Sequence, residues 1–120
     1  MPFIKQDSPI VIPTTDGKLI VEHFGISSNG QRRLSIAYMV APPGWTEPFQ
    51  TPEFDEYTLV SKGKKLFEVD GKEVVVEAGQ SILIVAGSRV RYSNPFEELC
   101  EYWSVCMPAF SLDTVHRQAL

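Results

Sequence analysis

The feature that most constrains the fold of this chain is a series of short apolar runs, each ended by a glycine or proline turn. Turn signals recur about every eight to twelve residues between Pro9 and Met107, and no run has the period and length of an amphipathic helix. Alternating apolar residues favour strands buried on one face. The expected strands are 9–13, 18–24, 33–41, 56–61, 65–69, 72–77, 81–85, 90–92 and 98–106. Short strands with this spacing predict an all-β sandwich or barrel.

Composition limits the classes of partner. The 120 residues fit one domain, 1–120, and are enough to bury a core. The net charge is −4 and the basic residues are scattered, which argues against a nucleic-acid or anionic-membrane partner, because both favour a basic patch. No apolar run reaches the ~18 residues of a membrane span, and the first residues lack a secretory-signal pattern. We therefore expect a cytoplasmic protein.

The two cysteines support a reducing compartment. Cys100 and Cys106 lie six apart in one expected strand, which separates them by roughly 20 Å. A disulfide requires Cα atoms within about 7 Å. We expect both to be free, buried thiols.

A first set of turn and polar residues has a regular spacing. Five residues separate Gly44 from Gln50, Pro52 lies two positions further, and three residues then precede Glu56. Six residues separate Glu56 from Gly63. A second set follows from Gly79 to Asn94, with Gly87 and Val90 between them.

Together these spacings resemble the two motifs of the cupin family, here of the small bacterial type. The resemblance implies an all-β double-stranded β-helix, or jelly-roll barrel. In cupins, two histidines and a glutamate of the first motif and a histidine of the second hold a metal inside the barrel. It also implies dimerisation through an outer sheet, so a homodimer is expected.

The sequence departs from the family at the metal ligands. Gln50, Pro52 and Val90 occupy the three histidine positions, and only Glu56 is retained. One carboxylate and one amide would not hold a transition metal with useful affinity. We therefore predict no metal and no other cofactor.

The chain has only two histidines from which to rebuild such a site. His23 either points into the barrel or, as we prefer, is a core or edge histidine satisfied by a hydrogen bond. His116 belongs to a tail, residues 111–120, that we expect to be loose, with the histidine exposed unless the tail folds back over the barrel mouth.

Glu56 is the predicted catalytic residue. A carboxylate inside an apolar barrel must be hydrogen-bonded, paired or protonated, and burial would make it a general acid or base near neutrality. Glu53 and Glu47 are close in sequence, so either could share a proton with it.

Further residues are expected to bind a ligand around Glu56. Tyr92 shares a strand face with Val90 and should point inward, with Arg91 outward. Trp45 lies in the loop entering the first motif, which is near the barrel mouth in cupins. The pattern leaves open which face of its strand carries Trp103. The predicted ligand-binding residues are Gln50, Glu53, Tyr38, Trp45, Tyr92 and Trp103.

Three functions remain open. The chain could be a metal-free acid/base enzyme of isomerase, cyclase or lyase type that acts on a small polar organic molecule. It could instead bind or sense such a molecule without converting it. The third alternative is a metalloenzyme, such as a dioxygenase, with an unorthodox site made from Gln50, Glu56 and His23.

Overall fold

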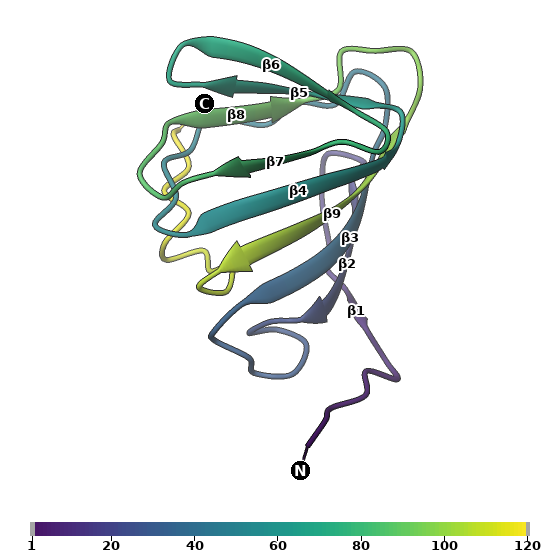
Figure 1. The fold of residues 1–120 in the computed structure, drawn as a ribbon, viewed down its shortest axis with the longest axis vertical. Coiled ribbons are helices and arrows are strands. Elements are labelled where there is room, and N and C mark those ends of the chain that lie inside the picture. The colour runs from purple at the N-terminus through teal and green to yellow at the C-terminus, as the bar shows by residue number, and fades with distance from the viewer. Residues whose placement is uncertain (1, 120) are drawn as a thin grey trace.

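The structure, a computed structural model, describes residues 2–119 and consists of antiparallel strands joined by turns (Figure 1). Each predicted strand is present, with ends shifted by at most two residues. The all-β prediction is therefore confirmed. The strands are β1 (Ile10–Val11), β2 (Leu19–Phe24), β3 (Ser35–Ala41), β4 (Asp55–Lys62), β5 (Lys64–Val69), β6 (Lys72–Glu77), β7 (Ser81–Ile84), β8 (Val90–Ser93) and β9 (Cys100–Met107).

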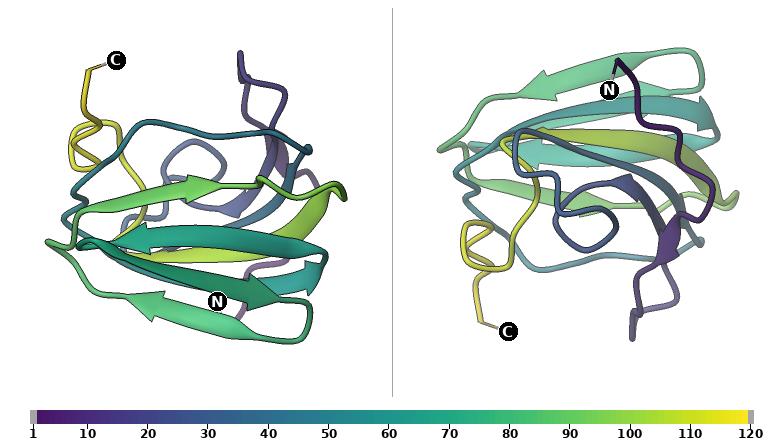
Figure 2. Two further views of the ribbon diagram at one scale, coloured as in Figure 1. Left: turned by 90° about the horizontal axis from the view of Figure 1, so that it is seen from above. Right: turned by 90° about the horizontal axis from the view of Figure 1, so that it is seen from below.

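The strands form two sheets that face each other. The larger has the order β1-β2-β3-β9-β4-β7 and the smaller the order β6-β5-β8. Figure 2 shows the two sheets from above and from below the view of Figure 1, and Figure 1 shows the N-terminal stretch projecting away from them. Within residues 2–119, no helix is long and apolar enough to cross a membrane.

Strand alternation determines which side chains enter the barrel. On β4, Glu56, Thr58 and Val60 are buried. On β9 the buried set is Cys100, Tyr102, Ser104 and Cys106, and both cysteines are free. The structure thus shows which face of β9 points inward, a question that the sequence alone had left undecided. An apolar cluster around Tyr102 fills part of the interior.

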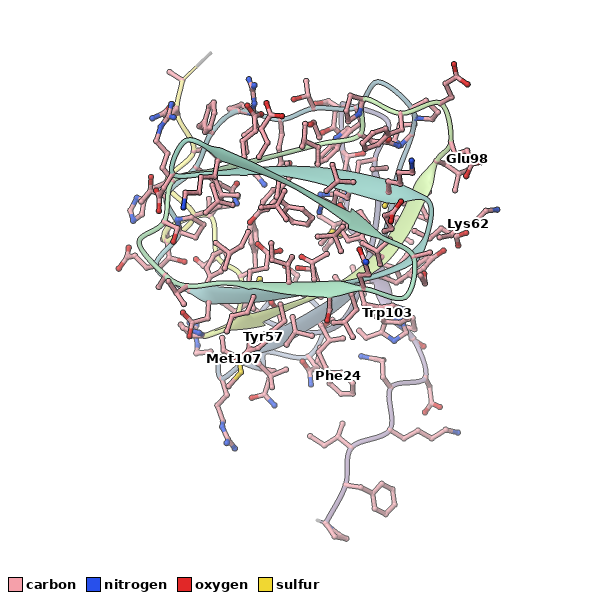
Figure 3. All side chains as sticks on the ribbon, turned by 45° about the horizontal axis from the view of Figure 1, so that its top comes forward. Phe24, Tyr57, Lys62, Glu98, Trp103 and Met107 are labelled. Atoms are coloured by element: carbon pink, nitrogen blue, oxygen red, sulfur yellow. The ribbon has the colours of Figure 1, made fainter. Side chains whose placement is uncertain are left out.

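The outer face of the larger sheet is apolar and only half covered. Tyr57 and Leu59 on β4, Leu83 on β7 and Met107 on β9 have exposed fractions between 39% and 47%. Figure 3 shows Tyr57, Trp103 and Met107 on this outer side, away from the space between the sheets.

The turn between β4 and β5 requires a glycine. Gly63 has a φ of +75°, and a Cβ added there would collide with the carbonyl oxygen of Leu99. A side chain would therefore be strained by both conformation and contact. This explains why a glycine follows Glu56 at this distance.

Residues 111–119 of the C-terminal tail pack on the barrel, although we expected residues 111–120 to be loose; residue 120 lies outside the part of the chain that the structure describes. The Glu53 N–H donates to the Thr114 carbonyl at 2.9 Å, and the Gln118 N–H donates to the Phe49 carbonyl at 2.8 Å. Val115 is buried against Phe54. Backbone pairing of this kind leaves little trace in side-chain pattern, so the sequence did not reveal it.

Candidate functional site

Glu56 lies inside the barrel and joins the two sheets through hydrogen bonds. Its side chain comes from β4 and is 9% exposed. The Tyr92 hydroxyl, from β8 in the smaller sheet, donates to Oε1 at 2.6 Å. The Ser104 hydroxyl on β9 donates to Oε2. Both carboxylate oxygens thus have a donor, which is the condition for burying the charged form.

Tyr92 remains a phenol under ordinary conditions. Burial raises its pKa well above the usual value, and the Glu56 charge and the hydrogen bond to it raise it further. The protonated hydroxyl therefore donates to Glu56 throughout the neutral pH range. This bond fixes the direction in which the carboxylate points.

Glu56 opens onto a cavity of about 190 Å³ that lies between the sheets. One part of its wall is apolar, formed by Ile12, Ile20, Ala37, Met39, Phe110 and Leu112. The polar part includes acids, bases and neutral donors, namely Lys18, Glu22, Ser27, Ser35, Glu47, Gln50, Glu56, Lys65, Tyr92, Ser104 and Arg117. A concave site with a few convergent polar groups is typical of small-molecule binding.

Two lysines in this wall are buried. Lys65, on β5, is 1% exposed, and Lys18 precedes β2 with its ammonium 4.0 Å from Glu47. Burial lowers the pKa of Lys18, and Glu47 and Glu56 oppose this change. Burial and the charge of Lys18 lower the pKa of Lys65 to about 7, although Glu56 and Glu47 act in the opposite direction. Lys65 therefore titrates near neutrality inside the cavity.

Sequence reasoning missed both lysines. A lysine is expected on the surface unless it is paired, and both were assigned to strand ends. The alternation of side chains along the strand could have predicted that Lys65 points inward, because Lys65 shares a strand face with Phe67, which is fully buried. No comparable signal marks Lys18, whose burial depends on the distant Glu47.

Three of the predicted residues meet at the cavity: Gln50, Glu56 and Tyr92. Gln50 is 2% exposed, and its Oε1 accepts a hydrogen bond from Arg117 Nε at 3.2 Å. Its backbone pairs with Val90 in both directions, at 2.9 and 2.8 Å. The motif positions Gln50 and Val90 thus lie side by side, as the cupin resemblance implied.

Trp45 is buried beside the cavity wall without forming part of its lining. Its indole N–H donates to Asp16 at 2.8 Å, and its ring lies 4.5 Å from the ammonium of Lys18. The position is that of a core residue which supports Lys18.

Tyr38 and Trp103 lie on the other face of the larger sheet, away from the cavity that the structure describes. The Tyr38 hydroxyl donates to Glu101, and the Tyr38 and His23 rings pack against Trp103 at 5.3 and 5.2 Å. On β3 it is the alternate residues, Ala37 and Met39, that line the cavity. The prediction took the opposite face because no motif residue on β3 or β9 fixed the register.

Of the two glutamates considered as partners of Glu56, Glu47 lines the same cavity and Glu53 does not. Glu53 and His116 form a hydrogen bond at the surface. The side chain of Glu53 is 61% exposed, so it is directed to solvent.

The groups present do not fit the metal site of the family. Gln50 Oε1 is engaged by Arg117, and both oxygens of Glu56 accept hydrogen bonds from hydroxyl groups. Among residues 2–119, no three His, Cys, Asp or Glu side chains are grouped as a metal site would need. Such a donor set is poorly suited to a divalent transition metal.

Comparisons with known proteins agree with this architecture. A family model described as a cupin domain matches residues 37–106. A variant of Streptomyces PAC13 solved with uridine has a TM-score of 0.77 at 12% identity, covering 100% of this chain and 92% of that chain. The polyketide cyclase RemF from Streptomyces resistomycificus has a TM-score of 0.74 at 13% identity, covering 100% and 87%. Structural similarity at 12% and 13% sequence identity shows a shared fold.

One curated relative is closer in sequence and much longer. The protein named endoribonuclease YbeY from Myxococcus xanthus is 43% identical over 108 residues, which are 90% of this chain. The chain spans 37% of the length of that protein.

Proposed function

This chain belongs to the cupin family, as its motif spacing predicted, and we propose that it is an acid/base enzyme acting on a small polar organic molecule held in the barrel. The observation that carries the proposal is the position of Glu56. It is a buried carboxylate that is held by Tyr92 and Ser104 and faces a cavity of about 190 Å³.

The geometry suits proton transfer by Glu56. The Tyr92 and Ser104 donors keep the carboxylate in one orientation, so it need not reorganise before it accepts a proton from the ligand. The buried ammonium of Lys18, whose charge acts on the same region, would stabilise negative charge that develops on the ligand. Removing a proton at one atom and returning it at another gives isomerisation, and loss of a leaving group or ring closure gives lyase or cyclase chemistry.

Two solved relatives make this proposal reasonable. PAC13 was solved with uridine, a small polar molecule, and RemF is described as a polyketide cyclase. Both share the fold over the full length of this chain.

Ligand recovery followed by a matched pair of variants tests the proposal. Native mass spectrometry of the protein, followed by denaturation, would identify a co-purified compound, and turnover of that compound would then be measured. We expect Glu56→Gln to lower the rate by about 10²-fold or more. Glu53→Gln, at an exposed carboxylate outside the cavity, should retain the wild-type rate. Equal turnover by Glu56→Gln and the wild type would refute the role of Glu56.

A second candidate function is a ligand-binding module without catalysis. The match to about a third of a longer protein, at 43% identity, favours it, because such a segment could serve the protein as an accessory domain. In that case the recovered compound would remain unchanged on prolonged incubation, and Glu56→Gln would alter its affinity alone.

A further inference from the structure

The amine of Lys65 has an unusual environment. No ion pair between residues 2 and 119 includes it. Instead, the nitrogen lies over the rings of Tyr102, Tyr92 and Phe67, at 3.6, 4.6 and 5.0 Å from their centroids. The ring faces attract a cation, but they exclude water and provide no carboxylate in contact.

The groups packed around Lys65 come from several elements. Their charges act in opposite directions on Lys65. Lys18 destabilises the ammonium form of Lys65, whereas Glu47 from the loop before β4 and Glu56 from β4 stabilise it. Cys100 on β9 makes a smaller contribution in the same direction as the glutamates. With the pKa of about 7 that results, the neutral amine of Lys65 is present in substantial amount near pH 7.

Lys65 also lines the same cavity as Glu56 and Tyr92. A ligand in this space therefore meets a neutral amine, a carboxylate and a phenol within one enclosed site. A desolvated lysine beside another cation is a recognised form of activated nitrogen nucleophile. An exposed lysine, by contrast, is almost fully protonated at this pH and does not attack carbonyl carbon efficiently.

We propose that Lys65 is the nucleophile of this site and forms an imine with a small aldehyde or ketone bound in the barrel. The proposal rests on the function proposed above, because it concerns the same cavity and names the substrate class as a carbonyl compound.

The step balances without an added oxidant or reductant. The lone pair of Lys65 Nζ attacks the carbonyl carbon, a C–N bond forms, and the carbonyl π electrons move to oxygen, which takes up a proton that the nitrogen releases. A second proton then passes from nitrogen to this oxygen, and the C–O bond breaks with loss of water as the C=N bond forms. Glu56, which lines the same cavity, would carry protons from nitrogen to oxygen in these transfers. The imine then withdraws electrons from the adjacent carbon, which makes its C–H bond more acidic.

Reductive trapping tests the proposal on the wild-type protein. The protein would be incubated at pH 7 with a low concentration of glycolaldehyde and sodium cyanoborohydride, which reduces an imine to a stable secondary amine. Digestion with a protease that cleaves after glutamate, followed by tandem mass spectrometry, would then locate the adduct. Among the lysines, we expect the adduct on Lys65 to exceed that on Lys64 by about tenfold or more, because burial removes water from the Lys65 amine and favours its neutral form. The rate should rise with pH through about 7.

Lys64 is a matched control, because it precedes Lys65 on β5 but is exposed and paired with Glu77. Lys65→Arg should abolish the trapped adduct and Lys64→Arg should leave it. Uniform labelling of Lys64 and Lys65, or no label on Lys65, would overturn the proposal, and the wild-type mapping decides this even if Lys65→Arg does not fold.

The two proposals fail separately. If Lys65 is unlabelled while Glu56→Gln still abolishes turnover of the recovered compound, imine formation is refuted and acid/base catalysis stands. If Lys65 is labelled while Glu56→Gln keeps full turnover, the role of Glu56 is refuted and the assignment of Lys65 stands.

Discussion

Two buried tyrosines allow a direct test of how Glu56 is held. The Tyr92 hydroxyl donates to Glu56, whereas the Tyr102 hydroxyl is buried with no hydrogen-bond partner among residues 2–119. Replacing each by phenylalanine removes the same atom from the same residue type at a buried position. The two variants therefore differ chiefly in what the hydroxyl was bonded to.

The expected effects differ in size and in sign. Tyr92→Phe removes a hydrogen bond to a charged acceptor and leaves a buried carboxylate oxygen without its donor, which costs about 1.5–3 kcal/mol. Tyr102→Phe removes a buried hydroxyl that has no hydrogen-bond partner in the protein among residues 2–119. It should leave the free energy of unfolding unchanged or raise it by about 1 kcal/mol.

Urea denaturation at pH 7, followed by tryptophan fluorescence, measures both variants. With a slope of about 1.5 kcal/mol per molar urea, a loss of about 2 kcal/mol lowers the midpoint for Tyr92→Phe by about 1.3 M. The midpoint for Tyr102→Phe should be equal to or above that of the wild type. Equal losses in both variants would refute the conclusion that the Tyr92 hydroxyl secures Glu56.

Three other measurements probe separate features. Because folding lowers the pKa of Lys65 to about 7, the unfolded chain binds more protons than the folded protein above pH 7, and the free energy of unfolding should rise from pH 6 to 9. In urea titrations the wild type should gain about 2–3 kcal/mol over this range relative to Lys65→Met, and parallel plots of unfolding free energy against pH for the two proteins would contradict this. Gly63→Ala should lower the free energy of unfolding by more than about 2 kcal/mol because of the contact with Leu99, whereas Gly71→Ala, at a φ of +84° with open space around it, should lower it by about 1 kcal/mol. Equal thermal unfolding midpoints for the two variants would contradict this. We expect a homodimer through the apolar outer face, so light scattering at micromolar concentration should give twice the mass of one chain for the wild type and the mass of one chain for Leu83→Glu. A monomeric wild type would argue against this interface.

The sequence predicted those parts of the fold and the site that a fixed spacing determines. Glu56 and Tyr92 were placed inside the barrel because the motif frame fixes which positions of β4 and β8 point inward. Gln50 was placed there because it occupies a ligand position of the first motif, and in the structure it pairs with Val90. Strand ends were predicted within two residues because glycine and proline mark them.

The residues that were misplaced or missed depend on long-range packing. Tyr38 and Trp103 lie on strands whose inward face no motif residue identifies. Lys18 and Lys65 are buried through contacts with side chains distant in the chain, such as Glu47 and Tyr102. A pattern along one strand does not record such contacts.

The docked tail has a practical consequence for biochemical work on this protein. Arg117 lines the cavity and binds Gln50, and Gln118 is bonded to Arg89 and to the Phe49 carbonyl. An affinity handle placed close behind Gln118 would therefore lie near Arg117, which is part of the cavity wall. A handle on the N-terminal stretch, which projects away from the barrel (Figure 1), lies apart from Arg117 and Gln50, so ligand-recovery experiments should use that stretch.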